Sequence, residues 1–251
     1  MIGVVIPTYG NLGYARRAVE SAFRSDESCK VAVIDDASPD WDPRYFEEFY
    51  EKYPGRFFCH RYSENGGVTR SWEKGYEILT WVDCKHIVFG NSDLIFSKDS
   101  LSRMSYVLEN TEIGLVGPLS NGPGKTTKNQ DIFNWLKSYR PRDEYQHIDY
   151  VSDWLLENVP PSRELIISGL NGFCMMASVE KMEIVKNFRG TVFNPTYRYR
   201  MVRSEDELCS QLNKLKIEQA VVCSSFVFHY RSVTRGDAHK HGAWYRMESE
   251  K

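Results

Sequence analysis

Short apolar runs alternate with helix-like segments along the first half of the chain, and each run ends in a polar or glycine-containing turn. The predicted strands are residues 3–6, 31–34, 57–62, 86–89 and 113–117. The predicted helices are residues 12–24, 43–53, 68–82 and 101–110, the last with Ser97 as its N-cap. Strand and helix in regular alternation predict an α/β fold: a single Rossmann-like, mostly parallel sheet with helices on both faces.

The second half is less regular. Residues 118–164 begin as a loop and then carry Trp and Tyr residues among polar ones, so we expect a helical insertion whose aromatic rings either pack a small satellite core or stack on a substrate ring. Beyond it we expect a glycine-punctuated strand over 164–177, a helix capped by Ser178 and a last strand over 219–228. These segments predict one domain in three parts: residues 1–117, the insertion 118–164, and residues 165–251.

Composition is that of an ordinary globular protein, with 41% hydrophobic and 26% charged residues in 251. No apolar run approaches the roughly 20 residues that span a bilayer, and the N-terminus looks like a first strand, not a signal peptide, so we expect a cytoplasmic protein. The six cysteines form no C-x-x-C pair and are expected to be reduced core residues.

The formal net charge of -2 gives no general attraction to nucleic acid. Two basic clusters stand out locally, although such clusters are usually solvated surface. They comprise Arg198, Arg200 and Arg203, and then Arg231, Arg235, His239, Lys240, His241 and Arg246. An anionic donor or acceptor could use either cluster.

Polar residues follow four of the predicted strands. They are Pro7-Thr8-Tyr9, Asp35-Asp36, Asn65 to Gly67, and Asn91-Ser92-Asp93. The carboxyl ends of parallel strands share one edge, which is where α/β sheets place ligands. A carboxylate there could anchor a divalent cation under a diphosphate. Taken alone, Asn91-Ser92-Asp93 fits an Asx turn equally well.

Two nucleotide-binding motifs are excluded. The turn after the first strand lacks the G-x-G-x-x-G spacing, so no nicotinamide cofactor is expected. Gly124-Lys125-Thr126 is not a phosphate loop, because Leu119 occupies the position of its first glycine and Pro123 removes an amide.

An acidic pair opens the predicted helix near residue 204. Ser204 and Glu207 have the spacing of a capping box, which accounts for these two residues but not for Asp206. Glu205 and Asp206 could simply complement the helix dipole, an effect of a few tenths to about 1 kcal/mol. They could also supply a general base.

The order of these motifs resembles an inverting family-2 glycosyltransferase of the GT-A fold, rhamnosyltransferase-like in its second half. The resemblance spans residues 2 to about 232. It is carried by VIPTY (5–9), IDDASPD (34–40), ENGGV (64–68) with Gly75, NSD (91–93), GFCMM (172–176), the Glu205–Asp206 pair and a final strand ending in His229.

The resemblance implies a nucleoside-diphosphate sugar as donor, with Pro7, Thr8 and Tyr9 bordering the nucleoside. Asp35 or Asp36 would accept a hydrogen bond from the base or ribose. The nucleotide pocket would also be lined by Asn65, Gly67, Asn91 and Ser92.

The resemblance also implies the chemistry. Asp93 would be the chief ligand of a divalent metal, Mn²⁺ or Mg²⁺, and His229 would assist the metal or the diphosphate. Asp206, in the Glu205–Asp206 pair, would be the catalytic base. The sharpest expectation is that Asp93 and Asp206, 113 positions apart, lie at one cleft.

Two departures and several alternatives stay open. Asn91 replaces the first Asp of the D-x-D metal motif, and Trp72 stands where relatives often have Asn. The chain could be a catalytically silent nucleotide- or sugar-binding module; a nucleotidyltransferase is disfavoured, because no glycine-rich basic loop follows the first strand. The acceptor could be a glycan, a protein side chain or a modified base in DNA, and the oligomeric state is open.

Overall fold

The structure is a computed structural model that describes residues 1–123, 128–194 and 204–231. Its strands are β1 (Ile2–Thr8), β2 (Lys30–Asp35), β3 (Phe57–Arg61), β4 (His86–Gly90), β5 (Leu94–Phe96), β6 (Leu115–Leu119), β7 (Glu164–Ile167), β8 (Cys174–Ser178) and β9 (Gln219–His229). Its α-helices are α1 (Leu12–Ser25), α2 (Glu47–Lys52), α3 (Val68–Trp81), α4 (Ser100–Asn110), α5 (Tyr145–Asn158), α6 (Val179–Arg189) and α7 (Ser204–Lys214). Short 3₁₀ turns cover Pro43–Tyr45, Lys128–Gln130 and Ile132–Asn134.

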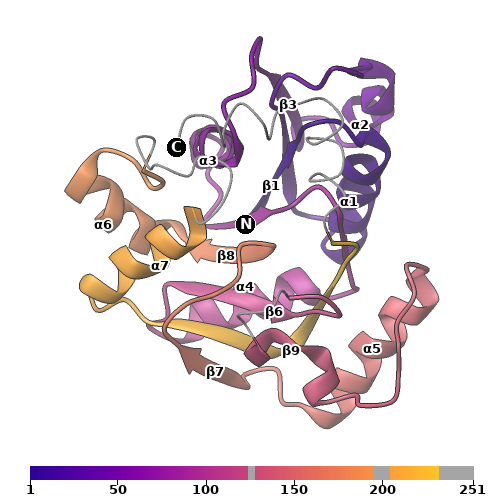
Figure 1. Cartoon of the computed structure of the whole chain (residues 1–251), viewed down its shortest axis with the longest axis vertical. Helices are drawn as coiled ribbons and strands as arrows, with labels where there is room; N and C mark the ends of the chain where they lie inside the picture. The colour runs from indigo at the N-terminus through magenta and orange to yellow at the C-terminus, as the bar shows by residue number, and fades with distance from the viewer. Residues whose placement is uncertain (124–127, 195–203, 232–251) are drawn as a thin grey trace, which may run out of the picture.

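The described strands form one sheet in the order β3-β2-β1-β4-β8-β6-β9-β5, and β7 pairs with β9 off this path. The first four strands in that order are parallel. β8 is inserted antiparallel between β4 and β6, whereas β6 and β9 are parallel. The predicted α/β fold and the parallel half-sheet are confirmed, and the curled sheet places β1 and β9 on opposite sides of β8 (Figure 1).

Helices cover both faces because side chains alternate along each strand. On one face, Val5 and Phe89 pack with residues of α3, α5, α6 and α7. On the other, Val4 and Val88 pack with residues of α1, α2 and α4. Both faces of the central strands are therefore buried, as parallel sheets require.

Several local predictions are corrected. The strand expected over 164–177 is two strands, β7 and β8, because the glycine-containing stretch between them carries the chain from β9, the partner of β7, to β4 and β6, the partners of β8. The helix expected over 43–53 is a 3₁₀ turn followed by the shorter α2. Because α4 begins at Ser100, Asp99 and not Ser97 stands at its N-cap, and the Ser97 hydroxyl donates instead to Phe226 O at 2.7 Å.

The caps of α6 and α7 also differ from expectation. Ser178 occupies the N-cap of α6 but makes no side-chain capping bond. Ser204 and Glu207 do not form the expected capping box, because the Ser204 hydroxyl pairs with the Thr69 hydroxyl at 2.5 Å and the Glu207 carboxylate binds Arg189.

The aromatic residues of 118–164 are mostly packed. Trp135, Tyr139, Tyr145 and Trp154 lie against one of the two hydrophobic cores, and Tyr150 is exposed. Ion pairs to α1 hold α5 and the segment before it: Arg17 binds Asp143, and Arg24 binds Asp149. The core-packing interpretation of these rings is therefore favoured over stacking on a substrate.

The cysteines are all free, and five of the six are buried, as expected. Burial raises the pKa of the Cys84 and Cys223 thiols to about 11. Within the described residues, no helix combines the length and apolar character that crossing a membrane requires.

Candidate active site

The Asn91-Ser92-Asp93 turn lies between β4 and β5, and the structure brings His229 to it from the end of β9. Asp93 is 3% exposed, and its Oδ1 lies 3.3 Å from His229 Nε2. The antiparallel pairing of Leu94 with His229 fixes this approach, as does a bond from Tyr230 N to Asp93 O at 3.1 Å. These two predicted metal-site residues, 136 positions apart, are therefore neighbours.

The tautomer of His229 follows from its second nitrogen. Nδ1 lies 3.0 Å from Gly122 O, which can only accept, so Nδ1 carries the proton. Nε2 faces Asp93, and it would offer its lone pair to a metal ion bound there, the usual arrangement of a metal-binding histidine. The Phe173 ring stacks on the imidazole at 5.3 Å between centroids and fixes its plane.

The same phenylalanine connects this pair to Asn91. Asn91 N donates to Phe173 O at 2.9 Å, and β4 and β8 pair up to Gly90 and Cys174. The Asn91 side chain is half-buried, whereas Ser92 is 2% exposed. Gly90 to Asp93 and Gly172 to Cys174 therefore form one continuous stretch of the sheet edge.

The acidic start of α7 lies beside that stretch. A Cβ added to Gly172 would come 2.7 Å from Glu205 Cδ, so the Glu205 side chain packs directly on the backbone of Gly172. Asp206, on the next position of the helix, is exposed. Contacts from Asp93 through His229, Phe173 and Gly172 thus reach Glu205, and the Glu205–Asp206 pair lies at the same edge as Asp93.

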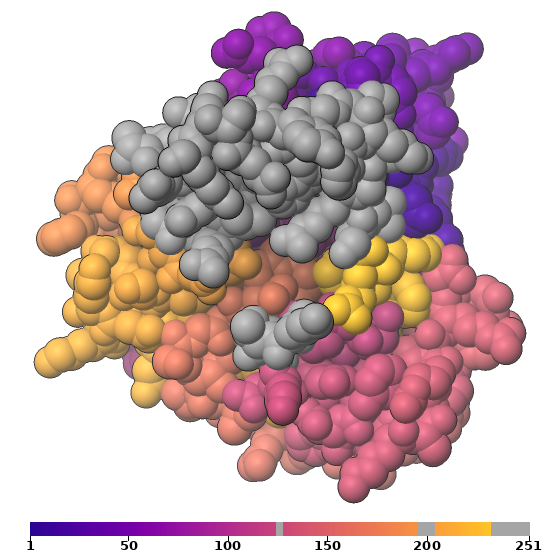
Figure 2. Space-filling model, in the orientation of Figure 1, coloured from indigo at the N-terminus to yellow at the C-terminus, as the bar shows by residue number. Residues whose placement is uncertain are grey.

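The end of β9 emerges between the two halves of the chain. Figure 2 shows its last described residues (yellow) between the indigo N-terminal half and the pink segment that contains α5. The Tyr230 hydroxyl donates to Asp143 at 2.7 Å and contacts Arg17 of α1. Burial and the Asp143 hydrogen bond raise the pKa of Tyr230, so this phenol stays protonated.

The predicted nucleoside contacts at the end of β1 lie at the neighbouring strand ends. Pro7 and Tyr9 are half-buried and so keep accessible surface, whereas Thr8 is buried and donates to Gly10 O at 2.8 Å. Asp35 is fully buried, with bonds from Ser38 and an ion pair to Arg61 at 3.4 Å. Burial raises the pKa of Asp35, although the Ser38 bonds and Arg61 oppose this.

Asp36 holds the next predicted turn. Its carboxylate accepts from Gly66 N and Gly67 N, at 3.0 and 2.6 Å, and pairs with Arg70 at 2.6 Å. Gly67 has a φ of 89°, the left-handed region that favours glycine. The exposed Asn65 side chain reaches Asp36 O at 3.4 Å. Asp36 is thus engaged in fixing the Asn65–Gly67 turn.

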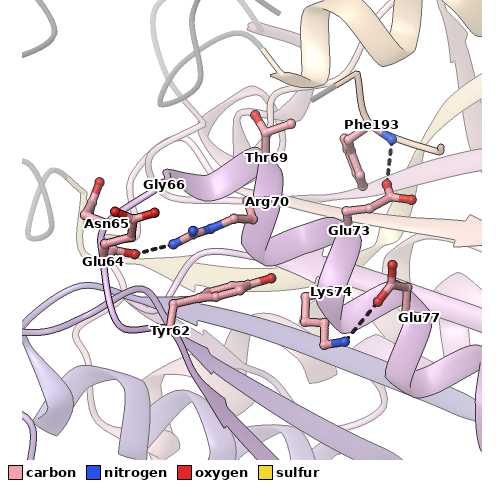
Figure 3. A pocket seen from close by; sticks show the side chains of 10 residues that line it. All are labelled: Tyr62, Glu64, Asn65, Gly66, Thr69, Arg70, Glu73, Lys74, Glu77 and Phe193. Atoms are coloured by element: carbon pink, nitrogen blue, oxygen red, sulfur yellow. Dashed lines mark hydrogen bonds and ion pairs between the residues drawn. The ribbon is translucent and has the colours of Figure 1, made fainter. Parts of the chain in front are cut away.

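A pocket of about 400 Å³ lies on the outer side of α3. Figure 3 shows Arg70 over the Tyr62 ring at one end and Glu73 beside Phe193 at the other. Glu73 accepts from Val192 N and Phe193 N, and burial raises its pKa. Of the predicted site residues only Asn65 lines this pocket, so it is separate from the Asp93 edge.

Some predictions fall outside the described residues: Arg198, Arg200, Arg203, and the basic residues from Arg235 to Arg246. Sequence reasoning missed Arg70 and Gly122. Neither residue has a local sequence signal, because Arg70 contacts Asp36 across 34 positions and Gly122 contacts His229 across 107 positions. In the part of the chain that the structure describes, no three His, Cys, Asp or Glu side chains cluster as a metal site.

Comparison with known proteins gives a family and a fold. The family model described as "Glycosyl transferase family 2" matches residues 3–155. No curated protein sequence matches the chain. The structure resembles that of the mannosyltransferase PcManGT from Pyrobaculum calidifontis in complex with GDP-Man and Mn²⁺, with a TM-score of 0.60 and 16% identity over 91% of this chain and 56% of that one.

It also resembles S. aureus TarS 1-349, with a TM-score of 0.60 and 13% identity over 93% of this chain and 61% of that one. This chain therefore spans about three fifths of the length of these two proteins. At such identities the likeness shows the fold alone, which is the predicted GT-A fold.

Proposed function

Because this chain belongs to glycosyl transferase family 2, we propose that it moves a sugar from a nucleoside-diphosphate sugar to an acceptor hydroxyl with inversion at the anomeric carbon. Asp206 is the general base, with Glu205 beside it, and a divalent metal binds at Asp93 and His229. The observation that carries the proposal is the approach of Asp93 to His229 at an edge that also holds the acidic start of α7.

The residues at Asp93 fit a hard divalent cation. One carboxylate oxygen and one imidazole nitrogen, whose other nitrogen is bonded to a carbonyl, make a usual partial donor set. Mg²⁺ and Mn²⁺ sites that serve phosphates often use one or two protein ligands and complete the shell with water and phosphate oxygens. The bound cation would supply Lewis-acid stabilisation of the leaving diphosphate.

Asn91 in place of Asp has a consequence here. The site has one carboxylate fewer than a D-x-D motif would supply, so the protein alone attracts the cation less strongly. We expect metal to bind weakly without the donor and more tightly once the diphosphate oxygens are present.

The acidic pair supplies the proton acceptor. An acceptor hydroxyl must lose its proton as it attacks, and a positioned carboxylate contributes typically 10²- to 10⁴-fold to such a step. Asp206 is exposed and can meet an incoming acceptor, whereas Glu205 packs on Gly172. Attack on the face opposite the leaving group inverts the anomeric carbon.

The test is a donor screen followed by matched substitutions. GDP-mannose and the other GDP- and UDP-sugars, with and without Mn²⁺, come first, because the neighbouring PcManGT structure holds GDP-Man and Mn²⁺. Binding appears as a thermal shift, since a ligand stabilises by RT ln(1 + [L]/Kd). Turnover is followed by release of the nucleoside diphosphate, and NMR of the product gives its anomeric configuration.

Asp206→Asn is expected to lower turnover by about 10²-fold or more while the nucleotide still binds. Asp93→Asn is expected to weaken binding of metal and diphosphate together. Asp83→Asn is the matched control, because Asp83 is exposed before the amino end of β4 and its φ of 62° suits Asn. Binding without turnover of any donor would instead identify a silent module, and a retained anomeric configuration would refute inversion.

A further inference from the structure

The end of β9 is not held to β6 by an ordinary ladder. The two strands pair in parallel from Leu115–Gln219 to Pro118–Val222, and then the register shifts, so that Leu119 faces Phe226. On this side of β9, a side chain makes the contacts at His229. Asn121 Nδ2 donates to His229 O at 3.1 Å, and Asn121 Oδ1 accepts from His229 N at 2.8 Å.

One amide group therefore bonds both backbone groups of a single residue, as a neighbouring strand would do. The side-chain amides of Asn and Gln offer a donor and an acceptor side by side in one plane, and Asn is the shorter. Asn121 is half-buried, so both bonds are partly shielded from water. The backbone of His229 is fixed from β5 on one side and from Asn121 on the other.

The next residue fixes the ring. Gly122 O accepts from His229 Nδ1 at 3.0 Å, which leaves Nε2 directed to Asp93. A Cβ on Gly122 would come 2.3 Å from Arg231 Cδ, so a larger residue could not sit here without displacing Arg231. Asn121 and Gly122 together set both the position and the tautomer of His229.

We propose that Asn121 is a positioning residue that holds His229 so that Nε2 faces Asp93, and that the site's affinity for a divalent cation depends on this bond pair. Only the second part, on the affinity for a divalent cation, rests on the proposed function. The first part concerns the orientation of His229 and can be measured without metal, donor or acceptor.

The other contacts of this loop explain why its position is stable. Gln130 is fully buried; its Nε2 donates to Pro118 O at 3.1 Å, and its Oε1 accepts from Asn171 N at 2.9 Å. Asn171 Oδ1 in turn accepts from Phe173 N at 3.1 Å. Phe173 is the ring that stacks on His229, so the loop before Gly122 and the stacking ring are linked through Gln130.

The decisive variant is Asn121→Leu, which is nearly isosteric and removes both bonds. Asn158→Leu is the matched control: Asn158 is exposed at the end of α5, and its Nδ2 donates to Trp154 O at 2.7 Å. The first readout is long-range ¹H–¹⁵N NMR of protein labelled on its six histidines, with His229→Gln to assign the signal. The second is Mn²⁺ binding, followed by EPR in the presence of GDP or UDP.

Wild-type protein is expected to show His229 with a proton on Nδ1, held by Gly122 O. In Asn121→Leu we expect part of the molecules to lose that proton from Nδ1, and an Mn²⁺ affinity about 10- to 100-fold lower, the usual effect of losing a residue that orients a metal ligand. The control should match the wild type in both measurements. An unchanged His229 signal in folded Asn121→Leu would overturn the proposal, as would an unchanged Mn²⁺ affinity.

Two further results have defined meanings. If wild-type protein binds no Mn²⁺ but the tautomer shifts in Asn121→Leu, positioning stands and the metal in the proposed function fails. If Asn121→Leu does not fold, Asn121→Asp replaces it, because it keeps the acceptor for His229 N and puts an acceptor oxygen in place of the donor to His229 O. A change in the His229 signal of that variant relative to the wild type supports the proposal, and an unchanged signal refutes it.

Discussion

Gly75 is the position where a single methyl group should both destabilise the protein and disturb the site. It lies in α3 against β1, and an added Cβ would come 2.2 Å from Val5 Cγ1 and 2.6 Å from Val5 Cγ2. Ordinary contacts begin at 3.4 Å, and Val5 is fully buried in a strand paired on both sides, so α3 must move by about 1 Å in Gly75→Ala.

The magnitude follows from two opposing effects. Alanine in a helix gains about 1 kcal/mol over glycine. Overpacking of a buried contact costs about 1–3 kcal/mol, and a contact this close belongs at or above the upper end. We expect a net loss of about 2 kcal/mol in the free energy of unfolding, or roughly 4–8 °C in Tm for a chain of this size. Because Gly67 of the predicted nucleotide-binding turn is the N-cap of α3, nucleoside diphosphate binding should weaken as well.

Gly13→Ala is the matched control. Gly13 is exposed in α1, and an added Cβ would meet no atom within 4 Å, so this variant should gain about 0.5–1 kcal/mol. Urea denaturation gives both free energies, and titration with GDP and UDP gives the affinities. If both variants shift stability in the same direction, the packing of α3 on β1 described here is wrong.

Two further predictions concern buried ionisable side chains. Burial lowers the pKa of His86 below its usual 6.5, so the unfolded chain takes up a proton at a higher pH than the folded protein does. The stability that neutral His86 contributes is therefore fully present above about pH 7 and is lost as the pH falls below 6.5. Wild-type protein should therefore exceed His86→Gln in unfolding free energy by more at about pH 7.5 than at about pH 5.5, and an equal difference would contradict this. Asp36→Ala leaves Gly66 N and Gly67 N without their acceptor and should cost about 2–3 kcal/mol. Faster hydrogen exchange at those two amides is the check, and unchanged exchange would show that Asp36 does not hold the turn.

The sequence predicted the parts of the fold that depend on local pattern. β-branched runs marked β1 and β2, helical spacing marked α1, and the order of the motifs indicated the family before any contact was known. Polar residues after apolar runs also indicated the strand ends where the candidate site residues lie. These signals are local because strand and helix periodicity is a property of neighbouring residues.

What the sequence did not predict depends on contacts between distant residues. The insertion of β8 between β4 and β6 is a matter of topology, which no local pattern records. The glycines of 168–173 fitted a strand with close backbone approach, and they form instead the connection that lets Gly172 meet Glu205. The bonds of Asp36 to Gly66, Gly67 and Arg70 likewise left no local signal, and the prediction that Asp35 or Asp36 accepts from the base or ribose stays a prediction.

α3 connects two parts of the candidate site, the Asn65–Gly67 turn and the acidic start of α7. Its amino end follows Gly67 of the turn held by Asp36, and Thr69, in its first turn, bonds Ser204 immediately before the Glu205–Asp206 pair. One turn further on, Glu73 holds Val192 N and Phe193 N. The described residues on either side of 195–203 are thus both bonded to one face of α3. The spacing between the Asn65–Gly67 turn and the acidic pair is therefore set by a helix packed on the sheet, which is the kind of support that the proposed catalytic arrangement needs.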